Sequence, residues 1–196
     1  RLENELRQSY LKSKDLAEKD TLTGLSNRFV FEDALQVAIK RNITHKLKLG
    51  LLIIGIDKFQ VINDMHGHDI GDLVLKKFSK RIQECLESEA LFSRLGGDEF
   101  SVLVANLKSE GQLGSIASRI IRNLEKPICV NSLEFKINIS VGMALHPDSS
   151  SDPIELLKCA DIAMYRAKAT TGSLALYFYQ EMQDDFIRHH DISKSI

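Results

Sequence analysis

The stretch SRLGGDEFSVLV, residues 93–104, has the form of a β-hairpin with an acidic tip. Apolar residues flank Gly96 and Gly97, and a glycine pair permits the positive φ angles that a tight hairpin turn needs. Asp98 and Glu99 follow the turn side by side. Adjacent carboxylates repel each other unless water or a cation compensates their charge. The stretch is therefore either an ordinary hydrated turn or part of a cation-binding site.

The segments around the hairpin predict an α+β fold. The continuous apolar run at residues 49–56 is typical of a strand buried on both faces. We expect a second hairpin within 128–146, turning at Asn131–Ser132, and a last strand at 174–179. Helices are expected at 27–41, 70–87, 110–124 and 153–169, with a polar loop at 57–69. This order predicts a mixed sheet of about five strands flanked by helices.

The composition narrows the class of protein. The 196 residues are 43% hydrophobic and carry a net charge of −1, so the chain is globular and lacks the basic field of a nucleic-acid-binding protein. A small anionic ligand is still compatible with this composition, because binding it needs only a local pocket of positive charge. The apolar run at 49–56 is too short to span a membrane. Three cysteines without metal-ligand spacing predict a cytoplasmic protein, or the cytoplasmic part of a membrane-anchored one.

The first 19 residues form a separate segment. They predict a charged connector helix with a thin stripe of Leu and Ser at heptad spacing. A solvated helix and a coiled coil both fit that stripe. We expect the globular domain to span residues 20–180 and residues 181–196 to be a linker toward a following domain.

A second polar loop supplies side chains suited to a nucleobase. NDMHGHDIGD contains Asn63, His68 and Asp72 and follows the predicted buried strand. Asn and Asp together can accept from guanine N1–H and N2–H₂ and donate to O6. Polar readout of this kind discriminates strongly, because a wrong base leaves buried groups without partners.

Five blocks together carry a family resemblance. DTLTGLSNR (20–28), IDKF followed by INDMHGHDIGD, RLGGDEF, SVGMA and ADIAMYRAK occur in the order and spacing of the GGDEF family, the diguanylate cyclases. The resemblance implies a palm-like fold akin to nucleotidyl cyclases and polymerases. It also implies a homodimer in which each domain holds one GTP with Mg²⁺, the two being condensed into cyclic di-GMP and pyrophosphate.

The resemblance also implies roles for single residues. Asn63 and Asp72 would contact guanine, with Phe59 and His68 lining the same pocket. Arg94 stands just before the turn and counts among the candidate nucleotide-binding residues. Lys168 falls at the position of the lysine that holds the triphosphate.

The catalytic and metal positions follow from the same comparison. Asp98 takes the position of a metal-ligating carboxylate and Glu99 that of its catalytic neighbour, both being candidate ligands. The backbone carbonyl of Ile56 is a further candidate ligand. Asp57 is a poorer one, because it lies roughly 6–7 Å beyond position 55 along the strand.

The departures from the family pattern fall on the metal and phosphate half of the site. Active members read D-x-D-x-F-K, whereas Gly55 and Gln60 stand here at the first and last of these positions. We expect a carboxylate at 55 to face Asp98, so its loss removes one side of a two-sided metal site. Ser173 stands near the position of a family arginine, and the feedback motif RxxD is replaced by residues 87–90, ESEA.

Three functions stay open at this point. We expect a catalytically impaired domain that binds GTP as a regulatory or dimerisation module, with weak Mg²⁺ binding or none. An active diguanylate cyclase and a structural spacer that binds nothing are the alternatives. The sequences at the two ends resemble connections to a sensory domain and to an EAL phosphodiesterase domain, and no nucleic-acid partner is expected.

Overall fold

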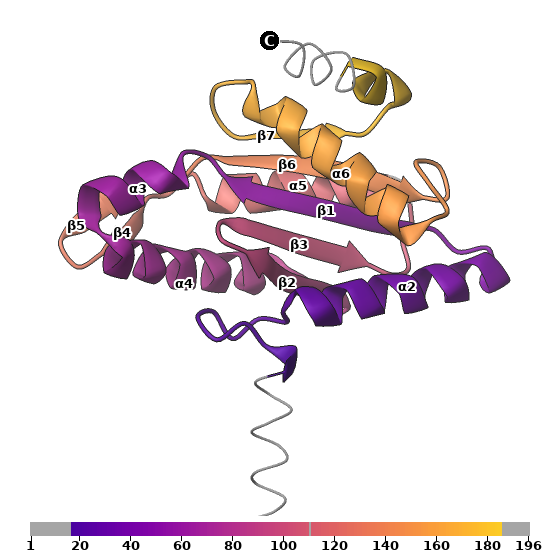
Figure 1. Ribbon diagram of the computed structural model, residues 1–196, viewed down its shortest axis with the longest axis horizontal. Helices are drawn as coiled ribbons and strands as arrows, with labels where there is room; N and C mark the ends of the chain where they lie inside the picture. The colour runs from indigo at the N-terminus through magenta and orange to yellow at the C-terminus, as the bar shows by residue number, and fades with distance from the viewer. Residues whose placement is uncertain (1–16, 110, 186–196) are drawn as a thin grey trace, which may run out of the picture.

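The computed structural model describes residues 17–109 and 111–185, and Figure 1 shows a central sheet with helices on both faces. The main sheet has five strands in the order β2-β3-β1-β6-β7. β1 is antiparallel to both of its neighbours, and β7 runs parallel to β6. The strands are β1 (Leu49–Ile56), β2 (Ala90–Gly96), β3 (Glu99–Val104), β6 (Ile139–His146) and β7 (Leu174–Tyr177). The predicted α+β fold and its five-stranded mixed sheet are confirmed.

Helices cover both faces of β1, which explains its continuous apolar sequence. Leu51 and Ile53 pack with α2 (Arg28–His45) and α6 (Pro153–Lys168). Leu52 and Ile54 pack with α4 (His68–Cys85) and α5 (Gly111–Asn123) on the opposite face. All eight residues of β1 are buried. Odd-numbered residues of β1 therefore point toward the α6 side, and this side includes position 55.

The placement of α6 depends on its start and on a glycine beneath it. Asp152 caps the helix by accepting hydrogen bonds from the amides of Ile154 and Glu155. A Cβ on Gly142 of β6 would lie 1.9 Å from the carbonyl oxygen of Ala160 and 2.3 Å from the amide nitrogen of Met164. Only glycine permits this close approach of helix and strand. The contact fixes where the last residues of α6 lie.

Two expectations about local structure are corrected. Residues 59–66 form a helix, α3 (Phe59–His66), instead of a polar loop. It begins after Lys58, which has a left-handed φ of 55° and makes no side-chain cap, so the sequence carries no start signal. The predicted turn at Asn131–Ser132 is present, but β4 (Ile128–Val130) and β5 (Leu133–Phe135) form a separate two-stranded sheet. The strand of the main sheet starts only at Ile139.

The two ends of the described chain pack on the domain. The segment before α2 is held by bridges that pair Ser26 with Lys19 and with Ser93 of β2. Residues 180–185 are helical, and Met182 is buried against Ile162 and Ala163 of α6. Residues 1–16 of the predicted connector and 186–196 of the predicted linker lie outside the described residues, so both domain boundaries stay predictions. Within the described residues, no helix combines the length and the apolar character that a membrane crossing requires.

Candidate nucleotide-binding site

The acidic turn lies beside the carboxyl end of β1. The backbone amide of Ile56 donates a hydrogen bond to the carbonyl oxygen of Asp98 at 3.2 Å. Gly55 pairs directly with Glu99 across the two antiparallel strands. Residues directly opposite in such a pair share one face of the sheet. The expectation that position 55 faces Asp98 is therefore wrong, because the strand register places Glu99 across from it.

Lys168 occupies the space that a side chain at position 55 would take. A Cβ on Gly55 would lie 2.9 Å from Cε and 3.0 Å from Nζ of Lys168, and 3.1 Å from Sδ of Met164. Lys168 is the last residue of α6, which packs across β1 and β6. A positive charge thus lies where the family pattern has a metal-binding carboxylate.

The residues present do not fit a two-sided Mg²⁺ site. Carboxylates from both strands are needed to hold such ions, and β1 supplies none at position 55. Asp57 does not replace it, because the hydrogen bond that its Oδ1 accepts from the Ser140 hydroxyl at 2.7 Å draws its carboxylate toward β6, on the side of β1 opposite to β3. Within residues 17–109 and 111–185, no cluster of three or more His, Cys, Asp or Glu could hold a metal ion. Asp98 and Glu99 remain half-buried at the turn as an acidic pair.

Asp161 of α6 belongs to the same electrostatic cluster. Loss of hydration and, to a smaller extent, the nearby Glu99 carboxylate raise the pKa of Asp161 to about 6, against the opposing charges of Arg28 and Lys168. A neighbouring negative charge disfavours the ionised form of a carboxyl group, and Glu99 supplies such a charge beside Asp161. The Lys168 ammonium offsets part of this negative charge within the protein itself.

A pocket of about 750 Å³ opens beside this cluster. Its lining joins the end of β1, the first turns of α3, the connection before β6 and the loop after α6. Three lysines take part, Lys58, Lys136 and Lys168, together with Asp57 and Asp98. The full lining is Ile56, Asp57, Lys58, Phe59, Gln60, Val61, Ile62, Asp98, Lys136, Ile137, Asn138, Lys168, Ala169, Thr170, Thr171 and Gly172.

Gln60 and Ser173, which stand where the family pattern has a lysine and an arginine, each make a hydrogen bond within the protein. The Gln60 amide donates to the Asp64 carboxylate at 2.8 Å along α3. The Ser173 hydroxyl accepts a hydrogen bond from the amide of Ile139 at 3.1 Å. Neither side chain replaces the positive charge that the family pattern has at its position.

The predicted base-reading residues gather where α3 meets α4. Asn63 Oδ1 lies 1.9 Å from the position that a Cβ on Gly71 would take, and Phe59 Cζ lies 3.3 Å from it. Gly71 directly precedes Asp72, so the Asn63 amide packs against the turn that carries Asp72. Phe59 is buried, whereas Asp72 and His68 are exposed on the first turns of α4. Of these residues only Phe59 also lines the pocket with the lysines.

Comparison with known proteins shows to which family this chain belongs. A family model described as "Diguanylate cyclase, GGDEF domain" matches residues 17–173. The chain belongs to the GGDEF family. The diguanylate cyclase TpbB of Pseudomonas aeruginosa is 40% identical over 153 residues, which cover 78% of this chain and 35% of TpbB. The cyclic di-GMP phosphodiesterase PdeR of Escherichia coli is 38% identical over 167 residues, which cover 85% of this chain and 25% of PdeR.

A solved structure of the TpbB GGDEF domain from Pseudomonas aeruginosa matches with a TM-score of 0.83 at 36% identity. The match covers 86% of this chain and 98% of that chain. The predicted family and fold of this GGDEF domain are thereby confirmed. The chain spans about a quarter to a third of the length of the two curated relatives.

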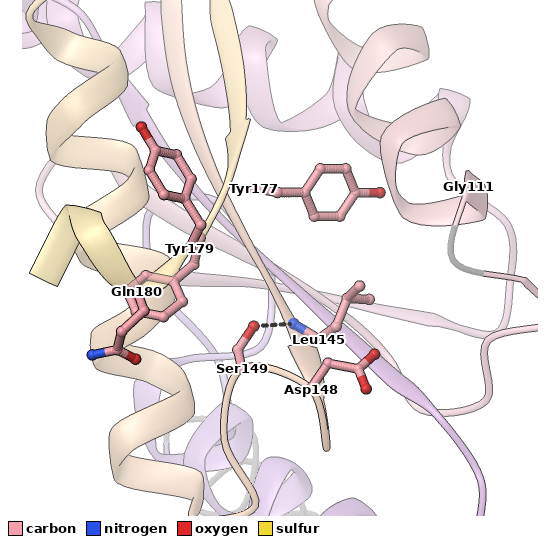
Figure 2. A pocket seen from close by; sticks show the side chains of 8 residues that line it. Gly111, Leu145, Asp148, Ser149, Tyr177, Tyr179 and Gln180 are labelled. Atoms are coloured by element: carbon pink, nitrogen blue, oxygen red, sulfur yellow. Dashed lines mark hydrogen bonds between the residues drawn. The ribbon is translucent and has the colours of Figure 1, made fainter.

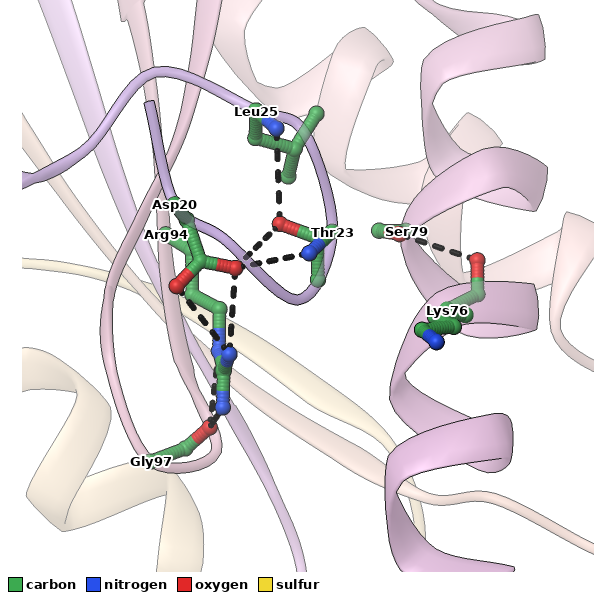
Figure 3. A network of polar contacts seen from close by, with 7 residues as sticks. All are labelled: Asp20, Thr23, Leu25, Lys76, Ser79, Arg94 and Gly97. Carbon is green, nitrogen blue, oxygen red and sulfur yellow. Dashed lines mark hydrogen bonds and ion pairs between the residues drawn. The ribbon is translucent and has the colours of Figure 1, made fainter. Parts of the chain in front are cut away.

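Arg94 has a structural role in this GGDEF domain. Its guanidinium donates to both oxygens of Asp20, at 3.1 and 3.2 Å, and to the carbonyl oxygen of Gly97 at 2.7 Å (Figure 3). Burial raises the pKa of Asp20, but hydrogen bonds from Thr23 and the Arg94 charge outweigh it and hold that pKa below its usual value. The Arg94 side chain is 11% exposed and ties the turn to the segment before α2. Its role as a nucleotide ligand stays a prediction.

A second pocket, of about 480 Å³, lies at the other end of the sheet. Figure 2 shows Tyr177, Tyr179 and Gln180 beside the loop that follows β6. Leu145 at its base pairs with Gly50, five residues from Gly55 along β1. The second pocket is therefore separate from the acidic turn.

Sequence reasoning missed three residues of the site. Asp161 lies inside the quoted block ADIAMYRAK, so the block itself carried the signal. Lys58 lies inside the quoted block IDKF, at a position to which the family pattern D-x-D-x-F-K assigns no residue, and Lys136 lies outside all five blocks. Lys136 reaches the pocket only because the chain leaves β5 and turns before β6. No sequence signal distinguishes it from a surface lysine.

Proposed function

We propose that this GGDEF domain binds a guanine nucleotide and acts as a regulatory or dimerisation module of a cyclic di-GMP signalling protein, with impaired cyclase activity. One observation carries the proposal: the side chain of Lys168, and no carboxylate, fills the space beside Gly55. GGDEF diguanylate cyclases generally use Mg²⁺, and the proposal is that this domain has lost one side of that site. The relatives support the signalling context, since one is named for making cyclic di-GMP and another for degrading it.

The base-reading half of the site supports nucleotide binding. Asn63 and Asp72 are brought together by the packing of α3 on α4. Asn63 offers an acceptor and a donor, and Asp72 offers acceptors for the two guanine N–H groups. On its Watson–Crick edge adenine has an acceptor at N1 and a donor at N6, the reverse of guanine. Asn63 and Asp72 together therefore favour guanine.

The wider context is part of the same proposal. The curated relatives are three to four times as long as the segment they share with this chain. We therefore expect further domains in the full-length protein, a sensory domain before this one and an EAL domain after it. Pairing of two copies through the GGDEF domains, in the cytoplasm, completes the expected setting.

An active diguanylate cyclase is the alternative function. The intact Asp98–Glu99 pair and the 40% identity to TpbB favour it. A spacer that binds nothing is the third reading. Turnover of GTP separates the cyclase from the other two, and nucleotide binding without turnover separates the module from the spacer.

The test is a calorimetric titration of the purified chain with GTP, GDP and ATP, followed by analysis of the reaction products. We expect GTP and GDP to bind and ATP to bind far more weakly. We expect no cyclic di-GMP with Mg²⁺ or Mn²⁺ above a control that carries Asp98→Ala and Glu99→Ala. Asn63→Ala and Asp72→Ala should each weaken GTP binding by roughly 1–3 kcal/mol, because guanine groups lose their partners.

Glu84→Ala is the matched control for these variants. Glu84 is exposed on α4, twelve residues after Asp72 and roughly 18 Å away along the helix axis. It should leave GTP affinity unchanged. Equal affinity for ATP and GTP would contradict the guanine site, and cyclic di-GMP above the control would establish the active cyclase.

A further inference from the structure

We infer that this domain holds the phosphates of its nucleotide with Lys58, Lys136 and Lys168 and without a divalent cation. The inference rests on the proposed function, because it takes a guanine nucleotide as the ligand. The family resemblance already implies Lys168 as a triphosphate ligand; the inference adds Lys58 and Lys136 and the independence of phosphate binding from metal. Lys58 and Lys136 lie at positions that the family pattern does not assign.

The three lysines reach one pocket from three different connections of the fold. Lys58 is the residue before α3, Lys136 lies between β5 and β6, and Lys168 ends α6. All three line the pocket of about 750 Å³ and are exposed to solvent, so their ammonium groups are accessible to a ligand. Such a concentration of positive charge suits a ligand with several negative charges. Lysine is an established phosphate binder that acts as a point charge.

The acidic groups in the lining do not cancel this charge. Asp57 accepts the hydroxyl hydrogen bond of Ser140, which directs its carboxylate toward β6. Asp98 is half-buried at the turn and is the other carboxylate of the lining. Within the pocket lining the three lysines outnumber the two carboxylates. Glu99 and Asp161 lie beside Lys168 and offset part of its charge, so Lys58 and Lys136 supply most of the excess positive charge.

The loop after α6 adds neutral donors at the same place. Thr170, Thr171 and Gly172 line the pocket next to Lys168. Threonine hydroxyls and backbone amides donate hydrogen bonds to phosphate oxygens. The loop thus complements the lysines on the side where the family arginine is missing.

The position of Lys168 is the reason to expect phosphate binding without a metal ion. Its Nζ lies 3.0 Å from the position of a Cβ on Gly55, on the face shared with Glu99. A cation bound at this end of β1 would meet an ammonium group where the family pattern has a carboxylate. A divalent ion on the phosphates would also neutralise the charge that the lysines recognise.

The experiment compares guanosine, GDP and GTP by calorimetry, each in Mg²⁺ and in EDTA. We expect guanosine to bind through the base-reading residues and each added phosphate to tighten binding. GTP should bind in EDTA at least as tightly as in Mg²⁺. Lys136→Gln and Lys58→Gln should each weaken GTP binding about tenfold, the scale of one charge-assisted hydrogen bond, and leave guanosine binding unchanged.

Lys158→Gln is the matched control, because Lys158 lies on the same helix as Lys168, ten residues earlier. It should change neither affinity. Thermal melts of all variants verify that the exposed substitutions leave the fold intact.

The outcomes separate the two proposals. Equal binding of guanosine and GTP, or more than a twofold loss of GTP affinity in EDTA, would overturn this inference and leave the proposed function standing. Unchanged GTP affinity in both lysine variants would overturn it as well. Failure of every guanine compound to bind would remove the proposed function and this inference together.

Discussion

The missing side chain at position 55 decides which charge lies beside Glu99. With glycine there, the end of the Lys168 side chain packs against the β1 backbone. The three atoms nearest to a Cβ at position 55 belong to flexible side chains, those of Lys168 and Met164. The position can therefore accept a side chain at the expense of moving Lys168.

This freedom makes repair of the site testable. Gly55→Asp combined with Gln60→Lys should make GTP binding about tenfold tighter in Mg²⁺ than in EDTA, or ~1.4 kcal/mol. The new carboxylate would lie opposite Glu99 and complete an oxygen-rich site for a hard cation. Calorimetry measures the gain, and Gln60→Lys alone is the control that adds a charge without a ligand. A double variant that melts like the parent and shows no Mg²⁺-dependent gain would place the defect elsewhere.

Asp161 gives a prediction about pH. Its pKa in the folded protein is raised to about 6, so the folded state binds more protons than the unfolded state between pH 4 and 6. The free energy of unfolding therefore falls as pH rises through this range, and the loss persists at neutral pH. Asp161→Asn should raise the free energy of unfolding at pH 7.5 relative to the parent, with the gain disappearing near pH 4. Urea unfolding at the two pH values measures this, and a pH-independent difference would contradict it.

At the scale of elements, the contact between α6 and β6 fixes the position of Lys168. Gly142→Ala would push a methyl group against the backbone at Ala160 and Met164, neither of which can yield as a side chain does. We expect a loss of about 1–3 kcal/mol in the free energy of unfolding, typical of overpacking. Gly111→Ala is the matched control, since a Cβ there meets nothing within 4 Å. A Gly142→Ala variant as stable as the parent would show that α6 can shift.

The elements differ in how far the sequence could predict them. β1 was predictable because both of its faces are covered, which demands an unbroken apolar run. α3 was not, because it has eight residues and begins after a left-handed Lys58 instead of a capping side chain. The missed lysine Lys136 shows the same limit, since the separate β4–β5 sheet that positions it depends on tertiary packing. The place of Glu99 opposite Gly55 depends on strand register, which the family pattern alone left open.

At the scale of the molecule, the site draws on both layers of helices. α6 brings Lys168 and Asp161 from one face of the sheet, while α4 brings Asp72 from the other. α3 crosses the end of the sheet between them and lies beside β4 and β5 in Figure 1. Some of the positions that the family pattern assigns to metal and phosphate have changed in this chain, whereas the positions that it assigns to the base retain their residues.

The bond between Arg94 and Asp20 has a mechanical consequence. The guanidinium of Arg94 clamps the carboxylate of Asp20 and the carbonyl of Gly97, the residue just before the acidic pair. The backbone amide of Arg94 is also held by the carbonyl of Ser26, so the clamp has a second anchor in the same segment. A displacement of the chain at residue 20 would therefore reach the tip of the hairpin by two routes, the Arg94 guanidinium and the backbone pairing of Ser26 with β2. The contacts of Arg94 and Ser26 thus couple the segment before α2 mechanically to the turn that carries Asp98 and Glu99.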